Sequence, residues 1–295
     1  MTGKQKKILI LGGTGTLGNE IVKQLGSKAD VTIFSRDELK QYKMKSKYPD
    51  CKYVLGDIRQ LNSHRNMFRG VDTVFHVAAL KHVDMLEENI AESIKTNIIP
   101  SIKLVDICRQ NKVSHCVFSS TDKAVYPINV YGNSKAISEK IFTSSNTEDD
   151  VKFLVYRWGN VIGSNGSVIN QFIFNLKNSL PITITDKDMT RFWISIEEAV
   201  SFMLATYESR LISGKKVLTH PLIMSANIMD IVDMLAEILR VRTPEIKIIG
   251  KRLGEKLHED LKADHEGGHV TSKEKQFSKQ ELREFLERYI EKGGH

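Results

Sequence analysis

The chain has 295 residues, of which 41% are hydrophobic and 27% are charged, the balance of an ordinary globular protein. Its longest nearly apolar stretch, residues 74–80, is far shorter than the roughly 20 residues that a membrane-spanning helix needs, so no membrane partner is expected. The net charge of +7 comes from scattered lysines. The one cluster, residues 40–47, contains a single aromatic residue, so we expect anionic small molecules rather than nucleic acid as partners.

Three cysteines, Cys51, Cys108 and Cys116, form an odd number without a Cys-x-x-Cys pair. This pattern indicates neither a disulfide framework nor a zinc site, so no metal is expected. Free cysteines fit a reducing compartment, and we expect a cytoplasmic protein.

Short β-branched runs alternate with segments of helical periodicity through the first half of the chain. Strands are predicted at residues 7–11, 31–34, 52–55, 71–77, 113–119 and 152–156, and helices at 20–26, 90–111 and 131–144. This alternation predicts an α/β fold with a Rossmann-type, doubly wound parallel sheet covered by helices on both faces. Such sheets bind ligands at the carboxyl ends of their strands.

The first strand runs directly into a glycine-rich loop, which is followed by a helical pattern. Glycines at these positions allow a tight turn and a close approach of the backbone to a pyrophosphate, and the helix N-terminus favours that anion. The loop therefore predicts a dinucleotide cofactor. The residues expected to contact it here are Gly12, Thr14, Gly15, Thr16, Leu17 and Gly18.

The end of the second strand predicts which dinucleotide binds. Proteins that prefer NAD place a carboxylate there to bind the ribose 2′-hydroxyl. Here Ser35 and Arg36 supply a hydroxyl and a cation that suit a 2′-phosphate, so we predict NADP, although two acidic residues follow directly. Asp57 and Ile58, after the third strand, would suit the adenine edge; the alternative for Asp57 is a simple turn residue.

The pattern changes after residue 160, where a loop at 163–167 precedes shorter elements. We predict that residues 1–160 form an NADP-binding Rossmann domain and that 194–220, with a helix at 195–209, return to it. Residues 161–193 and 221–295 are predicted to form a smaller C-terminal substrate-binding lobe. Residues 262–277 are polar and are predicted to be a mobile loop. Ser278 and Glu281 form a capping box that predicts a final helix.

Tyr131 and Lys135 form a YxxxK pair on one face of a predicted helix. A tyrosine that acts as a base near neutral pH must lower its pKa from about 10 by about three units, which costs about 4 kcal/mol. A cation about 4 Å away supplies roughly that much. We therefore expect Lys135 to stabilise the Tyr131 phenolate, which takes a hydroxyl proton as hydride leaves the same carbon.

The strand before that helix ends at Thr121, and Asp122 and Lys123 come next. Oxidation of a carbinol needs no more than the hydroxyl, the tyrosine and Lys135. Elimination of water beside a ketone also needs a base for the α-proton and an acid for the leaving hydroxyl. Asp122 and Lys123 could be that pair; the alternative is an ion pair within a turn or a helix cap.

Several short motifs occur in the chain in a recognisable order. They are GGTGTLG at 12–18, ALKHV at 79–83, SSTDKA at 119–124, YGNSK at 131–135, RWGNV at 157–161, MTRFW at 189–193 and GEKLH at 254–258. Together they resemble the soluble UDP-N-acetylglucosamine 4,6-dehydratases of the extended short-chain dehydrogenase/reductase family. The resemblance is close to the inverting type that opens pseudaminic acid biosynthesis and to capsule-sugar relatives. It covers about residues 7–260.

The resemblance implies a mechanism. Tightly bound NADP oxidises C4 of the sugar, with Tyr131 as the base, and is regenerated in each turnover. Lys123 removes the C5 proton, Asp122 protonates the departing 6-hydroxyl, and Thr121 orients the 4-oxygen. Hydride then returns to C6 and leaves a UDP-4-keto-6-deoxy-N-acetylhexosamine. As an acid, Asp122 would need a pKa raised by burial.

The resemblance also implies further contacts and an assembly. Cofactor contacts are implied for Ala78, Ala79, Lys81, Tyr131 and Lys135. Substrate contacts are implied for Lys81, Asn97, Asn160, Ser167, Arg191, Arg252 and Glu255. The arginines suit a diphosphate, with surface ion pairs as the alternative, and Asn97 otherwise caps its helix. A homo-oligomer is usual for such relatives.

The chain departs from the family pattern at Tyr126, where relatives commonly have a smaller polar residue, and across residues 262–277. Two other functions remain open. A UDP-sugar 4-epimerase would use the hydride step without elimination, so the Asp122–Lys123 pair argues against it. A non-catalytic NADP-sensing protein of the same fold would not need Tyr131 and Lys135.

Overall fold

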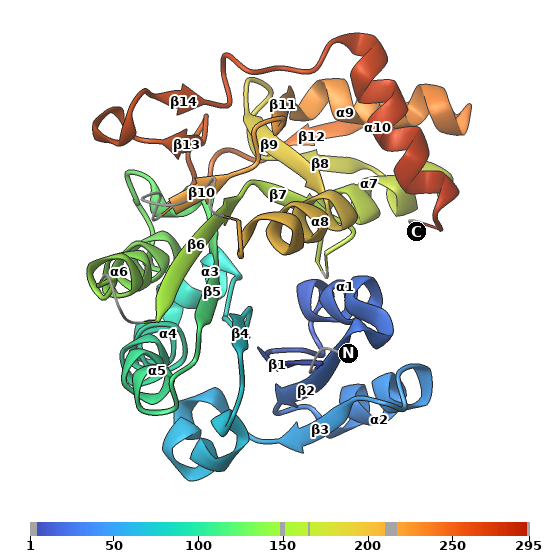
Figure 1. Cartoon of the computed structure of the whole chain (residues 1–295). Helices are drawn as coiled ribbons and strands as arrows, with labels where there is room; N and C mark the ends of the chain where they lie inside the picture. The colour runs from blue at the N-terminus through green and yellow to red at the C-terminus, as the bar shows by residue number, and fades with distance from the viewer. Residues whose placement is uncertain (1–4, 148–150, 165, 210–216, 294–295) are drawn as a thin grey trace.

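The computed structural model describes residues 5–147, 151–164, 166–209 and 217–293. Its main sheet has seven parallel strands in the order β10-β6-β5-β4-β1-β2-β3 (Figure 1). The strands are β1 (Lys6–Leu11), β2 (Ala29–Ser35), β3 (Lys52–Leu55), β4 (Thr73–His76), β5 (His115–Thr121), β6 (Lys152–Trp158) and β10 (Val217–Thr219). The predicted doubly wound parallel sheet is confirmed, and each predicted strand of the first half lies in it, with the same boundaries at 52–55 and slightly different ones elsewhere.

Helices cover both faces of this sheet because its strands are apolar on both sides. In β1, Ile8 and Ile10 pack into one core and Leu9 and Leu11 into the other. The first core lies under α1 (Thr16–Leu25), α2 (Glu38–Lys47) and α8 (Ile196–Thr206), and the second under η2 (Ile58–Phe68), α5 (Ile99–Gln110) and α6 (Val130–Ser144). Among the described residues, no helix is long and apolar enough to cross a membrane.

The helix predicted at 90–111 is interrupted. It consists of α4 (Ile90–Ser93), a π-helical segment η3 (Ile94–Ile98) and α5, after a short helix α3 (Val83–Glu88). Pro100 lies in the first turn of α5. Because proline has no N–H to donate to the preceding turn, the backbone widens just before it.

A smaller lobe lies at the carboxyl ends of the main strands (Figure 1). It contains a three-stranded sheet of β11 (Met224–Asn227), β9 (Thr190–Ser195) and β7 (Asn160–Ile162), and a pair formed by β12 (Ile246–Ile248) and β8 (Ile182–Ile184). The helices α7 (Val168–Lys177), α9 (Ile228–Leu239) and α10 (Lys279–Glu291) complete a third core. The capping box of Ser278 and Glu281 at the start of α10 is confirmed.

The prediction of a mobile loop at 262–277 is wrong for part of that segment. The strands β13 (Asp260–Lys262) and β14 (Val270–Thr271) pair antiparallel around a 3₁₀ turn, η6 (Asp264–Glu266). We call residues 259–272 the C-terminal hairpin. Its polar side chains bind the main domain instead of water: Arg157 of β6 donates to Glu266 at 2.6 Å and 2.8 Å.

Candidate active site

A cavity of about 670 Å³ lies at the carboxyl ends of β1, β4 and β5, and a second, of about 260 Å³, continues over the ends of β2 and β3. We call them together the cofactor cavity. Gly12 lies at its floor with φ +85°, and a Cβ there would stand 2.7 Å from the backbone of Ala78. The glycine-rich loop therefore packs more closely than any larger residue would allow.

The predicted loop residues all line the cofactor cavity. Gly12, Gly15, Thr16, Leu17 and Gly18 line its larger part, and Thr14 lines the smaller part. The helix α1 begins here with no acidic residue in its first turn and no side-chain cap at Gly15. Its first N–H groups and the positive end of its dipole are therefore directed at the cavity, and this arrangement fits a pyrophosphate.

The smaller part of the cofactor cavity is lined by Ser35, Arg36, Ile58, Ala78 and Ala79, all of them predicted cofactor contacts. Lys40 lines it as well; sequence reasoning missed this residue, although it lies only four residues after the predicted contact Arg36.

The acidic residues near Arg36 are bound by neighbouring groups. Asp37 accepts the Lys40 backbone N–H at 2.9 Å as the N-cap of α2, and it pairs with the Lys40 ammonium at 3.2 Å. Asp57 lines the cavity but caps η2, and its carboxylate is held by Arg59 at 2.6 Å. Asp57 therefore makes the hydrogen bonds of a turn residue, which is the alternative given for it above.

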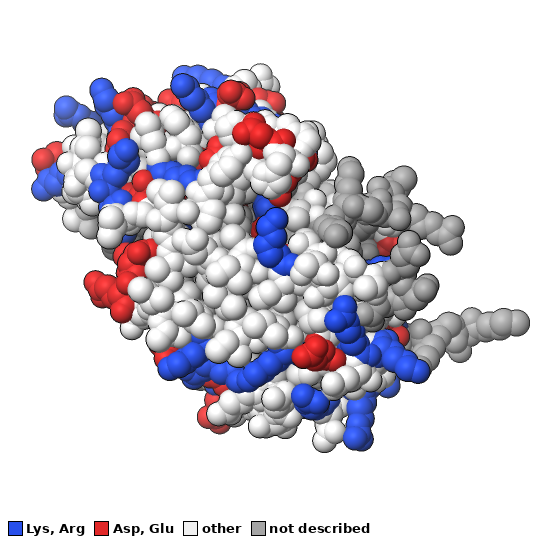
Figure 2. Space-filling view, turned by 90° about the vertical axis from the view of Figure 1, so that its left-hand side faces the viewer, with Lys and Arg blue, Asp and Glu red and all other residues white. Residues whose placement is uncertain are grey.

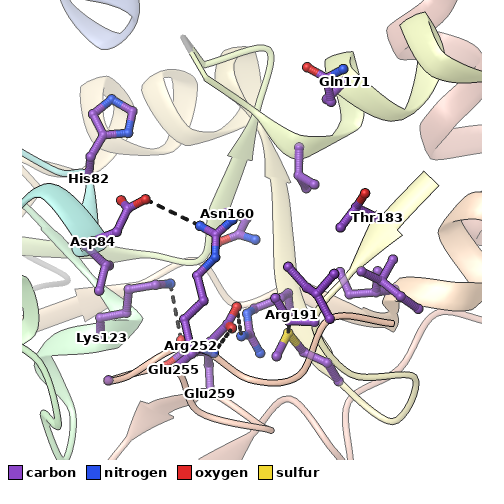
Figure 3. Close-up of a pocket in the computed structure, with 18 of the residues that line it drawn as sticks. His82, Asp84, Lys123, Asn160, Gln171, Thr183, Arg191, Arg252, Glu255 and Glu259 are labelled. Atoms are coloured by element: carbon purple, nitrogen blue, oxygen red, sulfur yellow. Dashed lines mark hydrogen bonds and ion pairs between the residues drawn. The ribbon is translucent and has the colours of Figure 1, made fainter. Parts of the chain in front are cut away.

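A substrate cavity of about 580 Å³ adjoins the cofactor cavity, between the main sheet and the smaller lobe (Figure 3). It is lined by the predicted residues Lys81, Asn160, Arg191, Arg252 and Glu255. Lys81 and Asn160 also line the cofactor cavity, where Ser167 lies. These residues therefore come together from segments that are far apart in the sequence.

The two predicted arginines have different surroundings. The guanidinium of Arg191 is buried and donates to the carbonyl oxygens of Thr190, Leu257 and Lys256 at 2.7–3.1 Å. Arg252 is exposed and lies 3.5 Å from Asp84 (Figure 3). Arg252 can therefore reorient toward an anion at little cost, because an exposed ion pair of this kind contributes about 0–1 kcal/mol.

Asn97 does not lie where the resemblance implied. It is buried in η3, its Oδ1 accepts the Leu80 N–H at 2.9 Å, and its Nδ2 donates to the Leu80 carbonyl and the Ser134 hydroxyl at 3.0 Å. The hydrogen bonds of its side chain hold the loop after β4 against α6. It lines neither the cofactor cavity nor the substrate cavity and caps no helix, so these contacts do not support the substrate contact that the resemblance implied.

The end of β5 carries a compact polar cluster. Asp122 is fully buried, and its Oδ1 accepts the Thr121 hydroxyl and the Lys123 ammonium, both at 3.0 Å. Lys123 lines both the cofactor and the substrate cavities, whereas Asp122 lies behind it. Of the expected acid–base pair, only Lys123 lines these cavities, because consecutive residues of the 3₁₀ turn η4 (Asp122–Ala124) point in different directions.

Tyr131 lines the cofactor cavity, but its electrostatic partner differs from the predicted one. Burial raises the pKa of Tyr131 to about 12, and the charge of Lys123 and the hydroxyl of Thr121 act in the opposite direction. The Lys135 ammonium instead donates to the Ser119 carbonyl at 2.6 Å. Burial lowers the pKa of Lys135 to about 7. The charge that lowers the pKa of Tyr131 is thus that of Lys123.

Glu259 is a site residue that sequence reasoning missed. It lines the substrate cavity, is 2% exposed, and its Oε1 lies 3.3 Å from the Lys123 ammonium (Figure 3). A signal was present, because Glu259, Leu261 and Ala263 alternate as the buried positions of a strand. Glu259 is the first residue of this alternating pattern, and it directly follows the GEKLH motif at 254–258.

The chain is similar to a known protein family and to two curated relatives. A family model described as "polysaccharide biosynthesis protein" matches residues 8–281. The inverting UDP-N-acetylglucosamine 4,6-dehydratase of Campylobacter jejuni is 42% identical over 79% of this chain and 71% of the relative. A UDP-glucose 4-epimerase of Rickettsia bellii is 41% identical over 69% of this chain and 63% of the relative. The chain thus spans less than two thirds of the epimerase.

Solved structures agree with this family. Pen from Bacillus thuringiensis has a TM-score of 0.87 at 28% identity, over 98% of this chain and 100% of that one. DesIV, a dTDP-glucose 4,6-dehydratase of Streptomyces venezuelae solved with NAD, shares the fold with a TM-score of 0.76 at 20% identity over 98% of each chain. Together with the matches above, this shows that the chain belongs to the polysaccharide biosynthesis protein family of extended short-chain dehydrogenases/reductases, which includes the inverting UDP-N-acetylglucosamine 4,6-dehydratases.

Proposed function

We propose that the protein is a UDP-N-acetylglucosamine 4,6-dehydratase, which removes water across C5 and C6 of its substrate. The observation that carries this proposal is the position of Lys123. Its amine lies where the cofactor cavity meets the substrate cavity, with Tyr131 on one side and the carboxylate of Glu259 on the other. A sugar that spans this junction would present its lower carbons to Lys123.

The chain's own residues account for the separate steps. Tyr131, which lines the cofactor cavity, takes the 4-hydroxyl proton as a phenolate. Thr121, fixed by its hydrogen bond to Asp122, orients the 4-oxygen. Lys123 then removes the C5 proton, which the new C4 ketone acidifies. Bound NADP would accept a hydride from C4 and return it to C6.

NADP is proposed over NAD because of the charges around the smaller part of the cofactor cavity. Arg36 and Lys40 line it. Asp37, the carboxylate nearest to the usual NAD position, caps α2 and pairs with Lys40. A 2′-phosphate would therefore find cations there, while a 2′-hydroxyl would find no unengaged carboxylate on Asp37.

A second candidate is a UDP-sugar 4-epimerase, which the identity to the Rickettsia protein favours. The two reactions give different products. Purified protein is incubated with UDP-N-acetylglucosamine and no reductant, and the product is observed by NMR. The dehydratase gives a C6 methyl group and a C4 ketone or its hydrate, whereas an inverted C4 carbinol with an intact C6 hydroxymethyl would establish the epimerase.

We also propose a homo-oligomer that buries the outer face of α4, η3, α5 and α6. Figure 2 shows a broad area of this side of the molecule without charged residues. These elements carry the exposed apolar side chains Ile90, Ile94, Ile102 and Ile137, each 43–52% exposed. An apolar face on two adjacent helices is best covered by the same face of a second copy.

We also propose the domain boundaries of the chain and the cellular compartment of the protein. Residues 1–160, joined by 194–220, form the NADP-binding domain, and 161–193 with 221–295 form the substrate-binding lobe. The pairing of β10 with β6 in the main sheet supports the return, although residues 210–216 lie outside the described part. Cys51, Cys108 and Cys116 form no disulfide in the described part of the chain, in keeping with a reducing cytoplasm.

A further inference from the structure

A tight turn at residues 252–255, which we call the substrate turn, forms part of the wall of the substrate cavity (Figure 3). The Glu255 N–H donates to the Arg252 carbonyl at 3.1 Å, and the Arg252 N–H donates to the Glu255 carboxylate at 3.2 Å. Gly254 lies between them with φ +75°, a conformation that favours glycine. The turn therefore holds two of the expected substrate contacts, Arg252 and Glu255, in a fixed relation to each other.

Asn129 connects the substrate turn to the helix α6. It is 6% exposed. Its Oδ1 accepts the Gly132 N–H at 2.6 Å as the N-cap of α6, and its Nδ2 donates to the Gly254 carbonyl at 2.8 Å. Tyr131 lies in the first turn of the same helix. One amide group thus binds both the start of the helix that carries Tyr131 and the turn that carries Arg252.

The two hydrogen bonds need the two ends of an amide. An N-cap needs an acceptor, which serine, threonine, aspartate and asparagine all provide. Among these, asparagine alone has an NH₂ group that can donate to a second backbone carbonyl. The contact is also close, because a Cβ on Gly254 would stand 2.8 Å from the Cβ of Asn129. The substrate turn therefore packs directly on the N-cap.

The start of α6 is itself fixed by its neighbours. A Cβ on Gly132 would stand 2.2 Å from the Lys123 carbonyl oxygen, so the first turn of the helix packs directly on η4. Glu87 of α3 accepts the N–H of the first helical residue at 2.6 Å. The position of the substrate turn relative to Tyr131 and Lys123 is therefore set through Asn129.

We propose that Asn129 is a positioning residue: by binding Gly254 it holds the substrate turn, and with it Arg252, where the diphosphate of the substrate binds. This inference rests on the sugar-nucleotide substrate proposed above. The guanidinium of Arg252 is exposed and lies 3.5 Å from Asp84, so it can move when an anion arrives. Its backbone belongs to the turn that Asn129 anchors, so the guanidinium starts from a fixed point.

This anchor acts on substrate binding and not on the chemical steps. A turn that is already ordered loses less conformational entropy when it meets the substrate, and this strengthens binding. Without the Asn129 donor, the substrate itself must order the turn. Once the substrate is bound, Tyr131 and Lys123 stand where they stood before, because a replacement that keeps the N-cap leaves α6 in place. The loss should therefore appear in KM and not in kcat.

The experiment replaces Asn129 with serine, which keeps the N-cap acceptor and removes the amide donor. Asn129→Ser should raise the KM for UDP-N-acetylglucosamine about tenfold and weaken UDP binding to the NADP-loaded protein by the same factor. Its kcat should stay within about threefold of the wild type. Its melting temperature should fall by less than about 2 °C, whereas that of Asn129→Ala, which loses the cap as well, should fall by about 2–4 °C. Asn178→Ser, at an exposed residue after α7 that lines neither cavity, should change none of these values.

A double-mutant cycle shows whether Asn129 acts through Arg252. In an Arg252→Ala background, Asn129→Ser should weaken UDP binding by no more than about threefold, because the turn has lost the side chain that it positions. A tenfold loss in that background as well, a wild-type KM in Asn129→Ser, or a kcat that falls while KM stays unchanged would each overturn the proposal. A wild-type protein that binds UDP but yields no 4-keto-6-deoxy product would refute the dehydratase function alone, and the UDP measurements would still decide the role of Asn129.

Discussion

Replacing Arg157 with methionine removes the cation at the centre of a buried ion network. Arg157 is 6% exposed and donates to Glu139 of α6 at 2.6–3.1 Å and to Glu266 of the C-terminal hairpin at 2.6 Å and 2.8 Å. Glu139 is 4% exposed and retains one other donor, the Ser120 hydroxyl at 2.5 Å. The variant therefore leaves a buried carboxylate without its cation.

The expected loss of stability comes from the buried carboxylate of Glu139, which has lost its cation. Breaking a buried pair by removing one partner costs about 3–5 kcal/mol, and the more exposed Glu266 adds little to this. The double variant Arg157→Met with Glu139→Gln removes the charge as well, so it should recover most of the loss. The unfolding free energy of the double variant should therefore exceed that of the single one.

Urea unfolding followed by circular dichroism measures both variants. With a denaturant slope of about 3 kcal/mol per M for a chain of this size, the single variant should lower the midpoint by about 1–1.7 M. The double variant should lie between it and the wild type. A single variant within about 0.3 M of the wild type, or a double variant less stable than the single one, would show that Glu139 does not depend on Arg157.

Other predictions concern the cofactor, the buried lysine and the oligomer. Arg36→Ala should weaken NADP binding about tenfold or more and change NAD binding little, as measured by calorimetry; equal losses for both would contradict the NADP assignment. Burial lowers the pKa of Lys135 to about 7 from an ordinary 10.5. Between these values the unfolded chain binds a proton that the folded protein does not, so this residue should make stability rise with pH by up to about 1.4 kcal/mol per unit. Lys135→Met should lose that rise in thermal unfolding at pH 7 and 9, and parallel curves for the two proteins would argue against it. Ile94→Glu should reduce the mass measured by light scattering to that of a monomer, whereas Leu222→Glu, at a more exposed apolar residue elsewhere, should not; an unchanged mass for Ile94→Glu would exclude this interface.

The sequence predicts the parts of the molecule that local patterns determine. The alternating apolar runs of the first half predict the main sheet because strands covered on both faces must be apolar on both. The glycine-rich loop predicts the cofactor cavity because Gly12 has to lie against Ala78 without a side chain. Both inferences use residues close together in the chain.

The parts that sequence reasoning missed depend on partners far away in the chain. The hairpin is ordered by Arg157 and Tyr126, which bind residues 109 and 138 positions later. Asp122 and Lys123 are adjacent, so no periodicity distinguishes which one faces the cavity. Asn97 has the amide that a substrate contact would need, but the backbone of Leu80 uses it.

The most direct test of the dehydratase function follows one hydrogen atom. Purified protein is given UDP-N-acetylglucosamine that carries deuterium at C4, and the product is analysed by NMR and mass spectrometry. The account predicts that the deuterium moves within the molecule to C6 and appears in a singly deuterated methyl group next to a C4 ketone. Deuterium that stays on a C4 carbinol, with no methyl group formed, would contradict it.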